Sequence, residues 1–224
     1  MRTNAALQAV LQGRFASEFG LRPQLPPDVL PLGIPEVDAL CGGLPRGALT
    51  EITGPASSGC TSLLCAALAQ ATADEETCAL VDVTDAFDPE SAAAAGVVLP
   101  RLLWIRCNGN AEKALRAADL LLQAGGFGLV AMDLADVPPG DGRRISLSSW
   151  YRFRRSVEST RTIFLVSGQE PYARQCASLA LEAGPVQAEW SGRQLEGVWL
   201  PVRRRKPVGV AMEARLRWKP EIAG

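Results

Sequence analysis

One stretch of the sequence determines the expected fold: Ala48-Leu49-Thr50-Glu51-Ile52-Thr53, then Gly54-Pro55-Ala56-Ser57-Ser58-Gly59, then Cys60-Thr61-Ser62. The first six residues have the character of a buried strand, and a helical pattern runs from 61 to 73. A glycine-rich loop between such a strand and a helix is the setting of the phosphate-binding loop GxxxxGK[ST]. Backbone N–H groups of this motif surround phosphate oxygens, and the helix N-terminus adds positive potential.

The loop at 54–62 departs from this motif at its main cation. Thr61 stands where the motif has the hydroxyl that ligates magnesium, but Cys60 replaces the lysine that meets the β- and γ-phosphates. A neutral thiol does not offset phosphate charge, so the loop keeps its spacing and loses its cation. Two interpretations follow: a weakened nucleotide site, or a turn that only joins strand and helix. We expect no cofactor and no metal site, with weak binding of ATP and Mg²⁺ left open.

Strands and helices alternate after this loop. Strands are expected at 78–83, 102–107, 129–133 and 162–166, and helices at 110–123, at 146–159 and after Pro171. This alternation predicts a mostly parallel sheet covered by helices on both faces. From Val186 onward the pattern changes to three antiparallel strands, at 186–190, 194–202 and 208–218. The predicted fold class is therefore α/β, with antiparallel strands at the C-terminal edge.

The N-terminal part has a different organisation. Apolar residues in 5–19 recur at helical spacing, which predicts an amphipathic helix within 1–21. The segment 22–35 contains five prolines and is expected to form an extended linker. The remaining residues, 36–224, are expected to form the core domain.

The composition excludes several kinds of chemistry. The 224 residues include no histidine, which excludes a Ser-His or Cys-His catalytic pair and a His-bearing zinc site. The six cysteines form no CxxC pair and mostly lie in apolar runs, as expected of core residues in a reducing compartment. Neither a signal peptide nor an apolar membrane span is evident, so we expect a cytoplasmic protein without membrane contact.

The near-neutral net charge of −1 conceals an uneven distribution. Residues 1–142 carry 8 basic and 17 acidic side chains, whereas residues 143–224 carry 15 basic and 7 acidic ones. An acidic first part joined to a basic second part suggests that the second part contacts nucleic acid or an acidic partner. Pairing of the two parts between copies of the chain, and so self-association, is the alternative.

The run before the loop is Gly33-Ile34-Pro35-Glu36-Val37-Asp38-Ala39-Leu40-Cys41-Gly42-Gly43-Leu44-Pro45-Arg46-Gly47. Together with the loop and with 77–89 and 129–133, it resembles the core of the bacterial RecA recombinase family. The resemblance implies a RecA-like P-loop fold, in which Asp133 matches the magnesium-supporting Walker B aspartate. It also implies that the N-terminal helix docks on a neighbouring subunit or partner. The interface candidates in that helix are Leu7, Val10, Leu11 and Phe15.

Three departures from the family pattern argue against ATP hydrolysis. Besides Cys60, Thr84 stands at the position of the catalytic glutamate, and a hydroxyl is too weak a base to activate water near neutral pH. Ser91 stands near the position of the tyrosine that stacks on adenine. We therefore expect a protein that is not an enzyme, although Asp85 is a possible substitute for the glutamate. Either Gly168 or Gln169 matches the family's nucleotide-sensing glutamine, and the second DNA-binding loop of the family looks very short here.

A basic and aromatic segment follows the position of Asp133. It contains the DNA-binding candidates Arg143, Arg144, Trp150, Arg152, Arg154 and Arg155. Guanidinium groups neutralise phosphates, and exposed aromatic faces stack on unpaired bases. The alternative is that Trp150 and Phe153, which are three residues apart, belong to the core and leave the arginines on a solvated helix face.

A second basic cluster consists of Arg203, Arg204, Arg205 and Lys206. The resemblance places it where family members carry lysines that reach a neighbouring subunit's nucleotide. Contact with DNA phosphates, contact with an acidic partner and a simple charged hairpin tip are alternatives.

These observations favour one function among three. The preferred prediction is a non-catalytic RecA-like accessory protein of DNA repair and SOS mutagenesis, similar to the ImuA type that serves translesion synthesis. Such a protein is expected to bind RecA or polymerase subunits and to hold single-stranded DNA. The alternatives are a DNA-dependent ATPase or recombinase with an atypical active site, and a SulA-like inhibitor of cell division.

Overall fold

The computed structural model describes residues 28–208 and 213–218. Its centre is a nine-stranded sheet of order β11-β10-β8-β3-β7-β6-β4-β5, with β9 paired to β10. Strands β3 to β8 are parallel, and β9, β10 and β11 are joined by antiparallel pairs. This confirms the predicted α/β class. The strands are β3 (Leu49–Thr53), β4 (Cys78–Asp82), β5 (Leu102–Arg106), β6 (Leu129–Leu134), β7 (Ile163–Gly168), β8 (Leu179–Ala183), β9 (Gln187–Ser191), β10 (Gln194–Lys206) and β11 (Glu213–Trp218).

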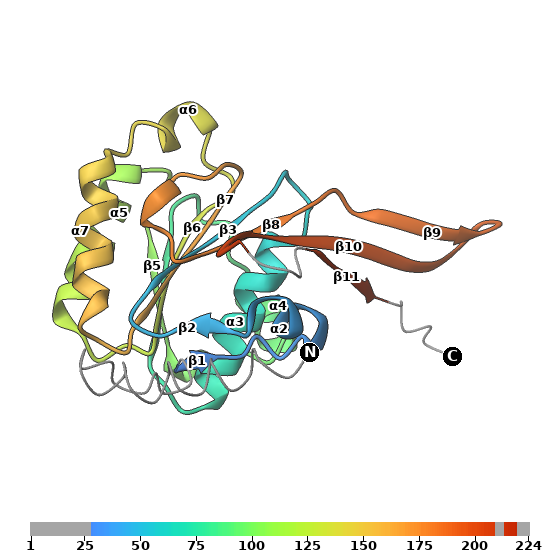
Figure 1. Cartoon of the computed structure of the whole chain (residues 1–224), viewed down its shortest axis with the longest axis horizontal. Coiled ribbons are helices and arrows are strands. Elements are labelled where there is room, and N and C mark those ends of the chain that lie inside the picture. The colour runs from blue at the N-terminus through green and yellow to red at the C-terminus, as the bar shows by residue number, and fades with distance from the viewer. Residues whose placement is uncertain (1–27, 209–212, 219–224) are drawn as a thin grey trace, which may run out of the picture.

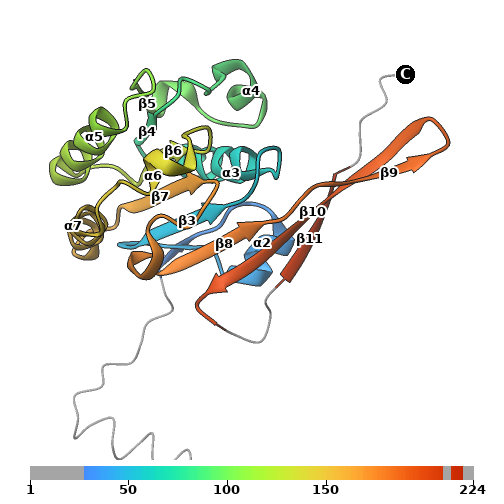
Figure 2. The ribbon, with the colours of Figure 1, turned by 90° about the horizontal axis from the view of Figure 1, so that it is seen from above.

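Helices cover both faces of the parallel strands, as Figure 2 shows. On one face lie α2 (Pro35–Cys41), α3 (Cys60–Ala73) and α4 (Pro89–Ala94). On the other lie α5 (Ala111–Ala124) and α7 (Leu147–Glu158). Short turns complete the fold: α6 (Pro139–Gly142), η1 (Leu99–Arg101) and η2 (Arg174–Cys176).

The central strands are buried on both faces, so their residues divide between two cores. In β7, Ile163 and Leu165 join the core beneath α3, whereas Phe164 and Val166 join the core beneath α5 and α7. The same alternation holds in β4 and β6, because successive side chains of a strand point to opposite faces. Every residue of β3, β4 and β7 is buried, which explains the apolar runs of β4 and β7, whereas β3 also buries Thr50, Glu51 and Thr53.

Residues 28–35 correct the predicted linker. Val29 and Leu30 form β1, which pairs with β2 (Leu44–Pro45) in a small antiparallel sheet. Leu30 and Leu32 are fully buried in the core beneath α3. This segment is therefore packed against the core through Leu30 and Leu32, and the part of the predicted linker that precedes residue 28 lies outside the described residues.

The C-terminal strands extend one end of the sheet into a long antiparallel ribbon. Its outer part consists of β9 and the paired half of β10, and it projects from the body (Figure 1). The helix predicted after Pro171 is wrong, because only the single turn η2 forms there. Strand β8 follows it and inserts between β3 and β10. The ribbon therefore starts beside the strand that leads into the glycine-rich loop.

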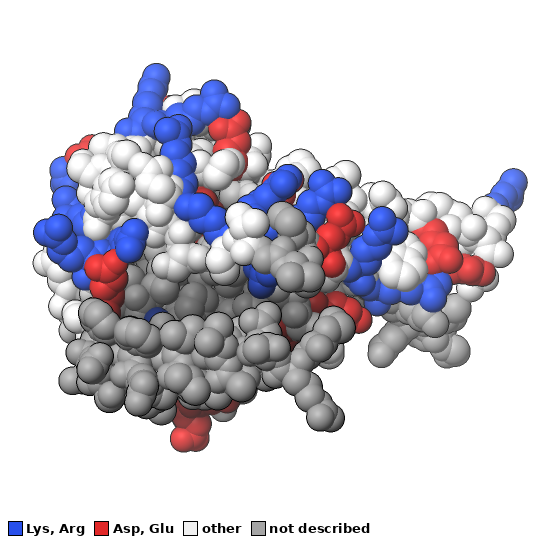
Figure 3. Space-filling model, in the orientation of Figure 1, with Lys and Arg blue, Asp and Glu red and all other residues white. Residues whose placement is uncertain are grey.

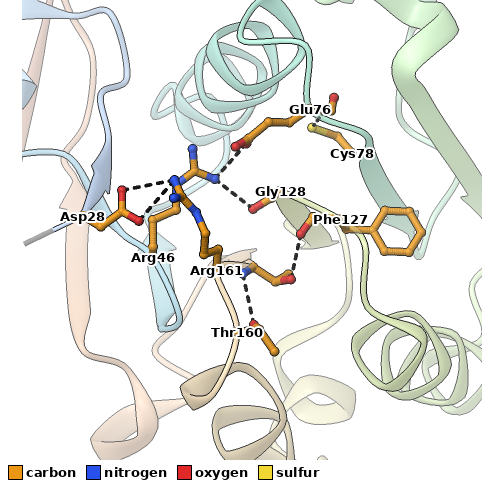
Figure 4. A network of polar contacts seen from close by, with 9 residues as sticks. Asp28, Arg46, Glu76, Cys78, Phe127, Gly128, Thr160 and Arg161 are labelled. Carbon is orange, nitrogen blue, oxygen red and sulfur yellow. Dashed lines mark hydrogen bonds and ion pairs between the residues drawn. The ribbon is translucent and has the colours of Figure 1, made fainter.

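A polar network closes the edge of the sheet opposite that loop (Figure 4). The Arg46 side chain is only 7% exposed, and its Nη1 donates to Glu76 Oε2 at 2.7 Å and to the Gly128 carbonyl at 3.4 Å. Arg161 pairs with Asp28 nearby, at 3.2 Å. The network thus joins the turn before β3 to the segments that enter β4, β6 and β7.

The cysteines and the helices agree with expectations from composition. All six cysteines are free thiols, and Cys60, Cys78, Cys107 and Cys176 are buried. Within residues 28–208 and 213–218, the longest helices are too short and too polar to cross a membrane.

Candidate functional site

The glycine-rich loop lies at the edge of the sheet where the parallel strands end. It runs from the end of β3 to the first turn of α3, and Gly59 precedes that helix with a φ of 83°. Ser57 also has a positive φ, 61°, so the loop curls tightly. The amide of Ser58 donates to the Pro55 carbonyl, whereas no backbone carbonyl of the described residues accepts from the amides of Cys60 and Thr61. The start of α3 therefore keeps free N–H groups for an anion.

The Cys60 side chain points into the loop. It is 6% exposed, and its Sγ lies 3.2 Å from the Ser58 hydroxyl oxygen. A Cβ built on Gly54 would meet both Ser58 Oγ and Cys60 Sγ, at 2.3 and 3.0 Å, so only glycine fits at the start of the loop. Burial raises the pKa of the Cys60 thiol, and Asp133 raises it further. The side chain in the lysine position is therefore neutral and enclosed.

A cavity of about 820 Å³ opens beside the loop. Besides the loop residues, its walls are largely aliphatic, formed by Ile34, Val186, Val198, Leu200 and Leu216. A Cβ on Gly59 would lie 2.6 Å from Leu200 Cδ2, which shows how closely β10 packs on the start of α3. The basic residue in the described lining is Arg217, which pairs with Glu189 at 2.7 Å and stacks over Trp199.

These residues do not fit a magnesium nucleotide triphosphate. Arg217 lies opposite Trp199 in the β10–β11 pairing, on the face of the ribbon that points away from Leu200 and Leu216. Among the described residues of the lining, Arg217 is the basic one, and its guanidinium is engaged by Glu189 rather than offered to the loop. The free amides at the start of α3 suit a single phosphate or carboxylate group instead.

Two carboxylates face each other next to the loop. Asp82 at the end of β4 and Asp133 near the end of β6 are registered partners. Asp82 is buried and accepts three hydrogen bonds, from the amides of Ala86 and Phe87 and from Trp104 Nε1 at 3.1 Å. The Asp82 carboxylate thus anchors the loop that follows β4.

Asp133 has a different environment. Its pKa is raised to about 6, mainly by burial and also by Asp82 and Asp136, while the hydrogen bond from the Ala135 amide at 3.0 Å opposes the shift. The carboxylate predicted to match the Walker B position therefore lies beside the glycine-rich loop and takes up a proton near neutral pH.

Thr84, at the position of the family's catalytic glutamate, and its neighbour Asp85 follow directly after β4. Thr84 lines a separate groove toward the start of α5. Asp85, the possible substitute for the glutamate, pairs with Arg106 at 3.4 Å. Its carboxylate is thus held away from the loop by a structural contact.

The segments after β6 and β7 are tied together. Arg143 forms a two-point ion pair with Glu170, at 2.7 and 2.5 Å. The ring of Tyr172 packs where a Cβ on Gly142 or Gly168 would clash with it. Gln169 Nε2 donates to the Ala135 carbonyl at 2.7 Å and lines the cavity. The two segments that the family resemblance associates with DNA therefore form one linked surface.

The basic helix α7 divides its aromatic residues between core and solvent. Trp150 is 1% exposed and packs edge-on against Phe153, with ring centroids 5.9 Å apart. The DNA-stacking role expected for Trp150 is therefore wrong, because its ring is enclosed in the core. Tyr151 points outward and is 48% exposed. The sequence signal for this was the spacing of Trp150, Phe153 and Val157, which places 151 on the opposite side of the helix.

The arginines of this region remain at the surface (Figure 3). Arg152 pairs with Asp119 of α5 at 2.9 Å, Arg154 with Glu158 at 2.7 Å and Arg144 with Asp141 at 3.0 Å. Arg155 is exposed and has no acidic partner among the described residues. A groove of about 470 Å³ lies on the outer face of α7, lined by Ser148, Tyr151, Arg152, Arg154, Arg155 and Glu158.

The cluster Arg203–Lys206 lies inside β10, which extends four residues beyond the predicted strand end. The hairpin-tip alternative is therefore wrong. Arg203 pairs with Glu213 at 3.0 Å, Arg205 pairs with Glu182, and Lys206 Nζ donates to the Arg174 carbonyl. Arg204 points to the other face of the strand and is half-buried. The interface candidates Leu7, Val10, Leu11 and Phe15 lie outside the described residues.

Comparisons with known proteins agree with this architecture. A family model described as the RecA N-terminal domain matches residues 27–140. Protein RecA of Methylococcus capsulatus is 43% identical over 108 residues, which cover 47% of this chain and 31% of that protein. Protein RecA of Streptomyces avermitilis is 39% identical over 117 residues, which cover 51% and 31%. The chain thus spans about a third of the length of these relatives. The crystal structure of the RadB recombinase shares the fold, with a TM-score of 0.64 and 18% identity over 84% of this chain and 96% of RadB.

Proposed function

Because this chain belongs to the RecA family, we propose that it acts in DNA repair as an accessory protein that does not turn over ATP. It holds single-stranded DNA on a basic surface and binds RecA or a translesion polymerase subunit in the cytoplasm. The observation that carries this proposal is the buried, neutral Cys60 thiol in the phosphate loop, at the position where the motif has its lysine.

The site chemistry supports the loss of ATP turnover. Phosphoryl transfer depends on cations that neutralise the developing charge and on a group that orients the attacking water. The loop provides neither, because Cys60 replaces the lysine and Thr84 replaces the carboxylate.

The outer face of α7 supports binding of single-stranded DNA. Tyr151 offers an exposed ring, and Arg154 and Arg155 lie one helical turn further along the same groove. A ring next to guanidinium groups suits a base that stacks while a neighbouring phosphate is neutralised. Surface ion pairs such as Arg154–Glu158 are weak enough to be exchanged for phosphate contacts.

The test of turnover measures phosphate release from ATP with and without single-stranded DNA. We expect no release above background in either condition. The control is the Asp133→Ala variant. Turnover by the wild type that this variant abolishes would overturn the proposal in favour of a DNA-dependent ATPase.

The test of DNA binding uses fluorescence anisotropy of a labelled oligothymidine over a range of salt concentrations. We expect Tyr151→Ala to weaken binding about tenfold through lost stacking, and Arg154→Ala with Arg155→Ala to reduce the salt slope by about 2. Arg116→Ala on α5 is the matched control, because Arg116 is also an exposed helical arginine paired at i,i+4. An affinity for oligothymidine that changes neither with salt concentration nor with any of these three substitutions would favour a protein inhibitor of the SulA type instead.

The partner is tested separately from DNA. Pull-downs with purified RecA and with translesion polymerase subunits are expected to capture the full-length chain after nuclease treatment. Failure with every one of these proteins would contradict the accessory role while leaving the DNA result unaffected.

A further inference from the structure

The projecting ribbon has an apolar stripe on one face. Its arm is defined as β9 with residues 194–199 of β10, and Figures 1 and 2 show it extending beyond the body. Most of β9 is exposed, whereas Val198 and Trp199 of β10 are half-buried and Gly197 is buried. An isolated two-stranded ribbon has little stability of its own in water. At the tip, Trp190 lies opposite Leu195 and is 61% exposed, although tryptophan is among the costliest side chains to leave in water.

The stripe continues from the tip to the cavity beside the phosphate loop. Ala188 lies opposite Val198, and it shares a face with Trp190 because the two are separated by one residue. Val198 shares a face with Leu200 for the same reason, and both line the cavity. One face of the ribbon therefore carries a protruding aromatic side chain at one end and an apolar cavity at the other.

Within the part of the chain that the structure describes, an unpaired arginine lies at the tip, and unpaired carboxylates lie at the cavity. Arg193 is exposed in the turn at the tip, and it has no acidic partner among the described residues. Glu36 and Asp136 are exposed at the cavity, and neither pairs with a basic side chain within 28–208 and 213–218. The tip thus carries Arg193 and Trp190, with Glu196 exposed on the neighbouring part of β10, and the cavity is apolar with Glu36 and Asp136 at its rim.

We infer that the occupant of this cavity is the arm of a second copy of the chain. Two arms pack face to face about a twofold axis beside Ala188 and Val198. Trp190 of each copy then enters the other copy's cavity beside the phosphate loop, and Arg193 reaches Glu36 and Asp136. The inference is independent of the proposed DNA and polymerase contacts, because none of these residues belongs to the DNA-binding face.

The spacing of the stripe fits such a pairing. Trp190 lies two residues outward from Ala188, and Leu200 lies two residues inward from Val198, each a distance of roughly 7 Å along the strands. A twofold axis beside Ala188 and Val198 therefore brings Trp190 of one copy over Leu200 of the other. The small Ala188 at the centre allows the two ribbons to approach closely. An isologous contact of this kind closes at a dimer and does not propagate.

Sedimentation velocity of the full chain at increasing concentration tests the dimer. We expect a monomer–dimer equilibrium whose dissociation constant rises at least tenfold in Trp190→Ser. Tyr151→Ser, which removes another exposed aromatic residue, is the matched control and is expected to leave it unchanged. Arg193→Glu is expected to weaken the dimer, and Glu36→Arg with Asp136→Arg in the same chain is expected to restore it. A monomer at all concentrations, or a dimer that ignores Trp190→Ser, would overturn the inference.

Photo-crosslinking locates the contact. Benzoylphenylalanine is placed at position 190, and ¹⁴N- and ¹⁵N-labelled chains are mixed before irradiation. We expect mixed-isotope crosslinks from position 190 to peptides containing Gly59 or Leu200. Crosslinks confined to one isotope, or directed to the α5 or α7 surface, would contradict the proposed geometry even if a dimer forms.

Discussion

Arg143 and Glu170 meet in a two-point ion pair that joins the segment before α7 to the loop after β7. Both oxygens of the carboxylate are engaged, in the same fork geometry that a phosphate group would offer to the guanidinium. Glu170 therefore competes with any nucleic-acid phosphate for Arg143.

Removing this competition is expected to strengthen DNA binding. In Glu170→Gln the amide no longer neutralises Arg143, so one more cation is free to contact phosphate. We expect tighter binding of a labelled oligothymidine and a salt slope larger by about 1. Arg143→Ala should show the wild-type affinity or weaker binding. Tighter binding by Arg143→Ala would mean that the pair itself, and not the freed arginine, controls access.

The facing carboxylates Asp133 and Asp82 are expected to respond to substitution with opposite signs. The pKa of Asp133 is about 6 in the folded protein and 3.8 ordinarily, so the folded state binds the proton more tightly. The resulting stabilisation is complete below pH 4 and is lost as the pH rises through 6. Asp133→Asn should therefore raise the free energy of unfolding at pH 7.5, by up to about 3 kcal/mol, with no gain near pH 4.

Asp82→Asn is the matched comparison. The Asp82 carboxylate accepts three hydrogen bonds in the core, so its replacement by an amide should cost about 1 to 3 kcal/mol at pH 7.5. Urea unfolding followed by circular dichroism at both pH values measures the two variants. Destabilisation by Asp133→Asn at pH 7.5 would show that this carboxylate is held as an anion.

The network around Arg46 is expected to matter for stability rather than for binding. Arg46→Ala leaves the Glu76 carboxylate without its partner and should lower the free energy of unfolding by about 3 kcal/mol. The control Arg161→Ala removes an exposed pair with Asp28 and should change it by less than about 1 kcal/mol. Equal effects in thermal or urea unfolding would contradict the distinction between a buried and an exposed pair.

Neighbouring aromatic residues of α7 should separate stability from DNA binding. Trp150→Ala opens a cavity in the core and is expected to cost about 3 to 5 kcal/mol. Tyr151→Ala should stay within about 0.5 kcal/mol of the wild type, because its ring is largely in solvent. A large loss of stability in Tyr151→Ala would remove it as a clean probe of stacking.

Restoring the lysine should restore nucleotide binding without turnover. Cys60→Lys places a cation at the loop, and ATP affinity measured by calorimetry is expected to rise at least about tenfold. Cys60→Met, which is similarly long but neutral, is the control. Phosphate release should stay at background, because Thr84 still provides no general base. Equal affinity in the lysine and methionine variants would contradict the role assigned to charge.

The sequence predicted the parallel strands well because both of their faces are buried, and continuous apolar runs such as 129–133 have few alternative interpretations. Strand β8 escaped prediction for the opposite reason. Its residues Leu179-Ala180-Leu181-Glu182-Ala183 are strong helix formers, and only pairing between β3 and β10 makes them a strand. The helix propensity of these residues is a weak influence compared with backbone pairing to two neighbouring strands.

The candidate site was predictable as a position but not as a surface. The strand–loop–helix spacing located Gly54–Ser62, whereas three aliphatic residues of the cavity wall, Val198, Leu200 and Leu216, come from β10 and β11, more than 130 residues later. Local patterns carry no information on such distant packing. For the same reason the sequence left Trp150 and Phe153 undecided between core and surface, a choice that depends on the sheet beneath α7.

The Arg46 network and the phosphate loop lie at opposite edges of one sheet, and this separation has an evolutionary consequence. The contacts that secure the chain reversals into β4, β6 and β7 involve neither Cys60 nor Thr84. Substitutions at the loop edge, such as those at these two positions, therefore leave this part of the folding energy unchanged. The scaffold can thus keep its fold while the chemistry and the binding partners of the loop edge change.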